Sequence, residues 1–225
     1  MGILNITVDS FSDGGRHLAF DDAVAHARRM VADGADIVDV GGESTRPGAI
    51  RVAESDEIQR VVPLVRALRA DGVPVSVDTM RASVAAGALA EGATIVNDVS
   101  GGLADPDMLG VVAQSRADFV LMHWRDHSTR FQATAHYDDV VAEVLGELLA
   151  QRDRALEAGL DSQRIILDPG LGFSKNWDHN WTLLRHLSEF QGLGHRVLVG
   201  ASRKAFLGEL LGGREPLGRD GATAA

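Results

Sequence analysis

Polar side chains directly follow several short apolar runs in this chain of 225 residues. Two such runs, residues 165–167 and 197–199, are rich in β-branched residues and lead into Asp168 and Lys204. Runs of this kind are typical of strands buried on both faces of a parallel sheet. Because ligands bind at the carboxyl ends of parallel strands, we expect one site there, formed from Asn5, Asp9, Asp13, Thr45, Arg46, Asp78, Asn97, Asp168, Ser202, Arg203 and Lys204.

These residue types suit a flat nitrogen heterocycle. Carboxylate and amide oxygens accept hydrogen bonds from ring N–H and amino groups, while Lys204 and the amide of Asn97 donate to a ring nitrogen or carbonyl. Phe173 or Met122 would lie against the face of the ring, as in ordinary ligand pockets. The sequence therefore predicts a slot with polar edges and an apolar wall.

Three further positions suit anions and a cation. Arg46, in a loop that contains glycine and proline, would bind a phosphate or carboxylate through both arms of its guanidinium group. Ser202 leads into a helix that we expect to begin near Arg203, and a helix N-terminus binds anions. Asn5 offers an oxygen ligand of the kind that Mg²⁺ takes beside substrate phosphates and water.

A structural role is the alternative for each of these residues taken alone. A single Asp after a strand is more often a helix cap or a loop hydrogen-bond partner. Asp21 and Asp22 are interpreted as first-turn residues of a helix, where the helix dipole favours them. His123 has no partner carboxylate at metal-ligand spacing and is interpreted as structural. The joint placement of polar residues at the ends of successive strands favours a site.

Strand and helix patterns alternate along the whole chain. We expect strands at 2–6, 37–40, 73–77, 94–96, 119–122, 165–167 and 197–199, and helices at 20–33, 57–68, 82–90, 108–114, 138–158, around 181–187 and from 206. This alternation implies an α/β domain with parallel strands, spanning residues 1–225. An open doubly wound sheet and a (β/α)8 TIM barrel both fit the pattern. Polar residues at nearly every strand end favour the barrel, with its eighth β/α unit lacking at the C-terminus.

The composition excludes several other classes of protein. The chain has no cysteine, so it has neither disulfides nor thiolate metal sites. Its formal net charge of -10 argues against nucleic-acid binding, which needs a basic surface. No apolar run is long enough to cross a membrane, and the first residues are no signal peptide. A cytoplasmic location is the expectation.

Seven ordered motifs resemble those of the dihydropteroate synthase family. Residues Gly2–Gly15 and Gly41–Gly48 are similar to its two signatures. Further motifs match in the same order at Ser76–Thr79, Asn97–Asp98, Met122–Trp124, Asp168–Phe173 and Ser202–Lys204. The resemblance implies a pterin-binding TIM barrel and a cytoplasmic, homodimeric enzyme of folate synthesis. Its reaction would join 4-aminobenzoate to 6-hydroxymethyl-7,8-dihydropterin diphosphate, releasing diphosphate and giving 7,8-dihydropteroate.

The same resemblance implies roles for individual residues. The pterin would be held by Asp78, Asn97, Asp168 and Lys204, the diphosphate or aminobenzoate contacted by Thr45 and Arg46, and Mg²⁺ ligated by Asn5; the aminobenzoate pocket would be lined by Pro47, Phe173, Ser202 and Lys204. The chemistry would be dissociative, with a cationic methylene on the pterin attacked by the aniline nitrogen. Sulfonamides, as aminobenzoate mimics, would bind the same pocket.

Two departures from the family pattern leave alternatives open. Val8 replaces the expected Pro or Asp, and an Arg-x-His pair that the family places on its last strand to bind diphosphate is lacking. A non-catalytic pterin binder would keep the pterin residues and lose the diphosphate site. A methyltetrahydrofolate-binding methyltransferase domain shares the barrel, but the intact Ser44–Gly48 and Ser202–Lys204 segments count against it. That enzyme would depend on a cobalamin partner, and the synthase on Mg²⁺.

Overall fold

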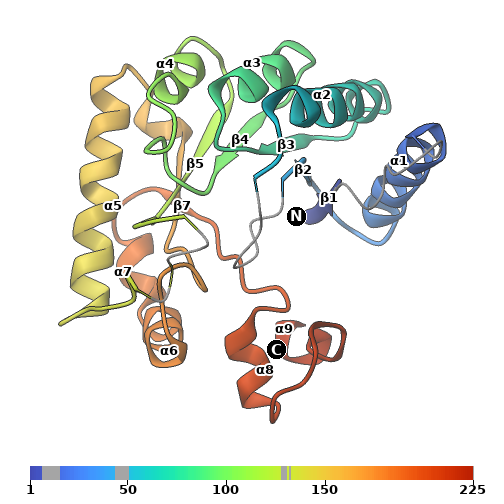
Figure 1. The fold of residues 1–225 in the computed structure, drawn as a ribbon. Coiled ribbons are helices and arrows are strands. Elements are labelled where there is room, and N and C mark those ends of the chain that lie inside the picture. The colour runs from blue at the N-terminus through green and yellow to red at the C-terminus, as the bar shows by residue number, and fades with distance from the viewer. Residues whose placement is uncertain (7–15, 44–50, 128–130, 132, 225) are drawn as a thin grey trace.

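A parallel sheet of seven strands organises the protein (Figure 1). The computed structural model describes residues 1–6, 16–43, 51–127, 131 and 133–224. The strands pair in the order of the sequence, and they are β1 (Gly2–Asn5), β2 (Val38–Gly41), β3 (Val75–Asp78), β4 (Ile95–Asp98), β5 (Asp118–Met122), β6 (Ile165–Asp168) and β7 (Arg196–Val197). This sequential parallel order is that of a (β/α)8 barrel and confirms the expected α/β class. The described residues contain no eighth strand.

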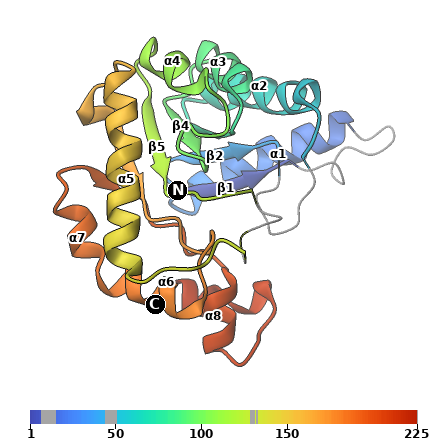
Figure 2. The ribbon, with the colours of Figure 1, turned by 60° about the vertical axis from the view of Figure 1, so that its left-hand side comes forward.

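A helix or a pair of helices follows every strand, and the helices between successive strands cover one face of the sheet (Figure 2). They are α1 (Arg16–Ala32), α2 (Glu54–Ala70), α3 (Ala82–Ala90), α4 (Met108–Ala113), α5 (Val140–Glu157), α6 (Trp177–Arg185), α7 (Leu187–Gln191), α8 (Ala205–Leu210) and α9 (Asp220–Ala224), with short 3₁₀ turns at Ser162–Arg164 and Pro216–Gly218. In both views α2, α3 and α4 lie side by side along the sheet. No helix among the described residues has the length and apolar character needed to cross a membrane.

The helices differ from the sequence-based expectation at several places, three of which bear on predicted residues. Helix α1 begins at Arg16, four residues before the expected start, so Asp21 and Asp22 lie exposed in its second turn rather than in its first. The helix expected around 181–187 is two helices, because the backbone leaves helical geometry at His186 (φ -110°, ψ 21°). Helix α8 begins at Ala205, not at Arg203.

Strand residues alternate between the helix-covered face and the inner face of the sheet. Residues such as Val40, Val77 and Leu167 pack with the helices in the main core. The residues that alternate with them along the strands lie on the inner face. Ile95, Val120 and Ile166 form a small separate apolar cluster there. This alternation assigns one residue at the carboxyl end of each of β1 to β6 to the inner face, where it lies above that cluster or beside it.

Candidate active site

The inner-face residues at the carboxyl ends of β1 to β4 form a polar row. Parallel register pairs Asn5 with Gly41, Gly41 with Asp78, and Asp78 with Asn97. A Cβ atom on Gly41 would lie 3.0 Å from Asn5 Oδ1 and 3.3 Å from Asp78 Oδ2. Glycine at this position therefore lets an amide oxygen and a carboxylate from the two neighbouring strands approach each other over the backbone of β2.

Asp39 supports this row from below, although it was not among the predicted site residues. It lies two residues before Gly41 on the same face of β2 and is only 5% exposed. The side-chain amide of Asn97 donates a hydrogen bond to Asp39 Oδ2 over 2.9 Å. Because a carboxyl group must face the NH₂ side of the amide, Asp39 leaves the carbonyl oxygen of Asn97 free to face a ligand. The period-2 alternation of β2 is the signal that could have identified it.

The acidic groups of this row hold their protons more tightly than usual. Burial raises the pKa of Asp39, against the hydrogen bond from Asn97, which lowers it. Burial also raises the pKa of Asp78 well above its usual value, and the negative charges of Asp39 and Asp98 raise it further. Titratable groups perturbed by burial and like charge are typical of functional sites.

Opposite charges lie beyond this row, at the ends of β6 and β7. The backbone N–H of Gly170 donates to Asp168 Oδ1 over 2.7 Å. Lys204 donates from Nζ to the carbonyl oxygen of Leu171, and its ammonium lies 4.7 Å from the centre of the Phe173 ring. Burial lowers the pKa of Lys204 to about 8, although the charge of Asp168 acts in the opposite direction. The site therefore has an acidic side on β2–β4 and a lysine beside Asp168 on the other.

The remaining predicted residues fall into three groups. Met122 is buried beside Asp168, its partner in the sheet register, and it lies on the inner face as expected for a ring contact. Ser202 and Arg203 lie exposed in the turn before α8, where Arg203 pairs with Asp220. Because α8 has six residues and Lys204 is its N-cap, the expected anion site at its N-terminus receives no support. The other predicted residues lie outside the described part of the chain: Asp9, Asp13, Thr45, Arg46 and Pro47.

A buried ion-pair network holds the residues on either side of segment 44–50. Glu43, just before the segment, accepts hydrogen bonds from Arg51 Nε (3.0 Å) and from Arg81 Nη1 (3.1 Å). Arg81 also donates to the carbonyl oxygen of Val52 over 2.7 Å and to Glu57 of α2. Arg81 therefore bridges the chain before and after the segment that contains Thr45 and Arg46, from a position just after β3.

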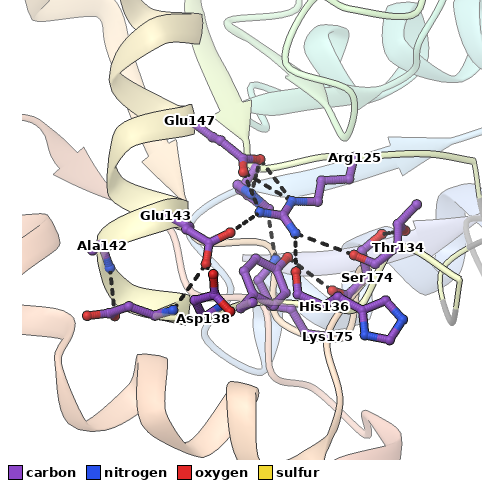
Figure 3. A network of polar contacts seen from close by, with 12 residues as sticks. Arg125, Thr134, His136, Asp138, Ala142, Glu143, Glu147, Ser174 and Lys175 are labelled. Atoms are coloured by element: carbon purple, nitrogen blue, oxygen red, sulfur yellow. Dashed lines mark hydrogen bonds and ion pairs between the residues drawn. The ribbon is translucent and has the colours of Figure 1, made fainter.

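A second network joins the segments that follow β5 and β6 (Figure 3). His123 lies between Lys175, whose Nζ is 2.8 Å from His123 Nδ1, and Glu147 of α5, whose Oε2 is 2.9 Å from His123 Nε2. Burial, together with the charge of Lys175, lowers the pKa of His123 to about 4. Hydrogen bonds from His123 and Arg125 lower the pKa of Glu147 to about 2, although burial acts in the opposite direction. The expectation that His123 is structural agrees with this placement, but its partners are not adjacent in sequence.

The His123 shift predicts loss of stability in acid. Because the folded-state pKa is depressed from 6.5 to about 4, the unfolded chain takes up a proton between those pH values while the folded chain does not. Urea titrations should therefore show a loss of about 3 kcal/mol in unfolding free energy from pH 6.5 to pH 4. His123→Gln, which cannot titrate, should remove that part of the pH dependence. The exposed His26→Gln is the matched control and should retain it; equal profiles for both variants would contradict the assignment.

Known proteins are similar to this chain in sequence and in fold. Residues 1–225 match a family model described as pterin binding enzyme. A dihydropteroate synthase of Mycobacterium leprae is 56% identical over 230 residues, which cover 100% of this chain and 81% of that protein. The structure of Xanthomonas albilineans dihydropteroate synthase with 4-aminobenzoic acid superposes with a TM-score of 0.90 at 45% identity, covering 98% of this chain and 79% of that one. The same enzyme in complex with 7,8-dihydropteroate gives a TM-score of 0.85 at 43% identity, with 97% and 78% covered.

Proposed function

Because the chain belongs to the dihydropteroate synthase family of pterin binding enzymes, we propose that it joins 4-aminobenzoate to (7,8-dihydropterin-6-yl)methyl diphosphate. The products are 7,8-dihydropteroate and diphosphate, so the enzyme is a transferase of a non-methyl alkyl group. The observation that carries the proposal is the inner row of Asp78 and Asn97 facing the Asp168 and Lys204 pair at the carboxyl end of the sheet. The relatives crystallised with 4-aminobenzoate and dihydropteroate support the same substrates.

The pterin is the ligand that these four side chains suit. Its ring N–H and amino groups would donate to the carboxyl oxygens of Asp78 and Asp168 and to the amide oxygen of Asn97. Lys204 would donate to the ring carbonyl or an unprotonated ring nitrogen. Met122, inward beside Asp168, supplies an apolar contact for the ring face. The ligand would thereby be held by its edges, as the composition of the row predicts.

The reaction exchanges a carbon–oxygen bond for a carbon–nitrogen bond. The bond between the pterin methylene and the diphosphate oxygen breaks with its electron pair on the leaving diphosphate, and the aniline nitrogen then attacks the cationic methylene and loses a proton to solvent. A carboxylate at Asp78 stabilises the developing positive charge, because preorganised charge in a partly buried site acts strongly. Phe173 and Lys204 would bind the aminobenzoate ring; Thr45, Arg46, Pro47 and Ser202 are proposed contacts from the family resemblance alone.

Mg²⁺ fits the acidic side of the site. Asn5 presents its Oδ1 beside Asp78 at the end of β1, and Mg²⁺ takes one or two protein oxygens together with substrate phosphates and water. The described residues contain no cluster of three or more His, Asp or Glu side chains suited to a metal, which agrees with an ion held largely by its substrate. When bound, the ion would neutralise charge on the leaving diphosphate.

The experiment that tests the proposal is formation of dihydropteroate by the purified protein from the two substrates. We expect product with Mg²⁺ and a loss of turnover after chelation that added Mg²⁺ restores. Pterin binding without product would indicate a non-catalytic pterin binder. Methyl transfer from methyltetrahydrofolate to a cobalamin protein would indicate the methyltransferase. Sulfonamides should compete with 4-aminobenzoate.

The family resemblance also supports a cytoplasmic homodimer as the working form. Light scattering coupled to size-exclusion chromatography should give twice the chain mass of 23.9 kDa. A monomer that is fully active in the product assay would contradict the dimer.

Lys204 predicts an alkaline limit to substrate binding. With a pKa of about 8, its ammonium is charged below pH 8 and loses its proton above. If the substrates need the charged form, their KM should rise roughly tenfold for each pH unit above 8. Lys204→Arg stays charged throughout, so its KM should be higher at pH 7 but flat up to pH 10. A wild-type KM that is also flat would show that the charge of Lys204 is not needed.

A further inference from the structure

The segment between β6 and α6 has an unusual backbone. Gly170 and Gly172 have φ angles of 68° and 79°, and Ser174 has a φ of 48°, a conformation that is unfavourable for a residue with a side chain. Ser174 is 1% exposed, and two residues of the chain after β5 hold it: Thr134 Oγ1 lies 2.7 Å from its Oγ, and Tyr137 OH donates to its carbonyl oxygen over 3.0 Å. Such a conformation persists where its surroundings determine it.

Lys175 extends this anchoring by one residue. Its side chain is buried, with 9% of the residue exposed, and its Nζ donates to the carbonyl oxygen of Phe173 over 3.0 Å. The same Nζ lies 2.8 Å from His123 Nδ1 at the end of β5. Lys175 therefore connects the backbone at Phe173 to the neighbouring strand end, and it does so as a buried side chain.

Helix α5 fixes the orientation of this connection. Because the ionised Glu147 carboxylate can only accept, the neutral His123 ring donates from Nε2 to Glu147 and accepts at Nδ1 from Lys175. Arg125 binds Glu147 as well, donates to the carbonyl oxygen of His136 over 2.6 Å, and lies 3.8 Å from the centre of the Tyr137 ring. The position of the Lys175 amine is thus set by His123 and, through it, by Glu147 on α5, and not by solvent.

The other end of the connection is the aromatic wall of the candidate site. The Phe173 ring packs edge-on against Phe131, with 5.1 Å between ring centres, and lies under the ammonium of Lys204. Lys204 donates to the carbonyl oxygen of Leu171. Two lysines therefore bind carbonyls two residues apart on the same segment: Lys204 from the side of the ligand, and Lys175 from the protein interior.

We propose that Lys175 is a positioning residue for 4-aminobenzoate: it does not touch the substrate, but it fixes residues 171–174 so that the Phe173 ring meets the aminobenzoate ring. The proposal rests on the proposed function for the identity of that ligand. It separates two parts of the site. The pterin row on β2–β4 is built without Lys175, whereas the aromatic wall is built through it.

Lys175→Met tests the proposal because methionine is also a long unbranched chain but has no hydrogen to donate. We expect the KM for 4-aminobenzoate to rise at least tenfold, while the KM for the pterin diphosphate changes less than threefold. Amide hydrogen exchange of residues 171–175 should become faster in the unliganded protein, since the segment loses an anchor. Tyr137→Phe removes only the hydroxyl that binds Ser174, and should produce a smaller change of the same kind if Lys175→Met folds poorly.

A double-mutant cycle asks whether Lys175 acts through Phe173. In a Phe173→Ala background, Lys175→Met should raise the KM for 4-aminobenzoate no further, because the ring that it positions is gone. Leu64→Ala is the control for general destabilisation: Leu64 is buried in α2, away from this segment. It should lower the Tm and leave both KM values and the exchange of residues 171–175 unchanged.

Three results would overturn the proposal. They are unchanged exchange of residues 171–175 in Lys175→Met, an equal rise of both KM values, and full additivity with Phe173→Ala. Absence of product from the wild-type protein would instead contradict the proposed function. The exchange experiment needs no turnover, so it would still decide whether Lys175 holds the segment.

Discussion

Asp78→Asn should lower kcat/KM about 10²–10³-fold, the range seen when one preorganised charge-stabilising group is removed. The same substitution should raise the Tm. Burial and the neighbouring carboxyl groups raise the folded-state pKa of Asp78 well above its usual value, so at neutral pH an ionised Asp78 opposes folding. Between the unfolded-state pKa and the folded-state pKa of Asp78, the folded protein binds the proton and the unfolded chain does not. The free energy of unfolding therefore falls as the pH rises through that range. Asparagine, which does not ionise, removes that cost and also removes the charge that the reaction uses.

This prediction combines a lower kcat/KM with a higher Tm. A variant that merely misfolds would instead show a lower kcat/KM and a lower Tm. Asp118→Asn is the matched control. Asp118 lies at the amino end of β5, at the opposite end of the strands from the site, where it pairs with Arg196. It should keep wild-type kinetics. If Asp78→Asn retained full activity, Asp78 would have no role in stabilising the transition state.

Glu57→Leu should destabilise the protein by about 3–5 kcal/mol, the typical effect of removing one partner from a buried ion pair. Glu57 is 1% exposed and accepts hydrogen bonds from Thr79 Oγ1 over 2.6 Å and from Arg81 Nη1. Leucine would leave the hydroxyl hydrogen of Thr79 and one N–H of the Arg81 guanidinium group without the acceptor that Glu57 provides. Urea unfolding followed by circular dichroism gives the free energy change.

The same helix supplies the control for this variant. Glu54 lies exposed in the first turn of α2, so Glu54→Leu should change stability by less than about 0.5 kcal/mol. Similar losses for the two variants would mean that the effect comes from helix propensity or surface charge. A second consequence would follow from the bridge made by Arg81: in Glu57→Leu, exchange at residues 51 and 52 should become faster.

The sequence was sufficient to predict the order of the elements because hydrophobic periodicity reports burial directly. All seven strands were expected within a few residues, and α3 was predicted with its observed bounds, Ala82–Ala90. Element ends were less predictable. The periodicity of apolar residues did not predict the start of α1 at Arg16 or the break at His186. The short β7, Arg196–Val197, ends before the predicted residue Val199.

Residues of the candidate site could be predicted where they directly follow a strand. They could not be predicted where side chains from distant parts of the chain contact each other. Asn5, Asp78, Asn97 and Asp168 could be named because parallel strands end at one edge. Asp39 was missed because it lies inside a strand, two residues from that edge. The partners of His123 were missed because Glu147 and Lys175 are 24 and 52 residues away in the chain, and no local spacing encodes such a meeting.

The sheet order has a consequence for how the chain acquires its structure. Every strand pairs with the next strand in the sequence, and the separation of paired residues ranges from 19, between Ser76 and Ile95, to 46, between Phe119 and Ile165. Loop-closure entropy grows only slowly over such lengths. Each β/α unit can therefore dock on the preceding one soon after it leaves the ribosome. Assembly would proceed by addition at a single growing edge, and β2 and β3 would pair, with the Asp78 position set, well before Lys204 is synthesised.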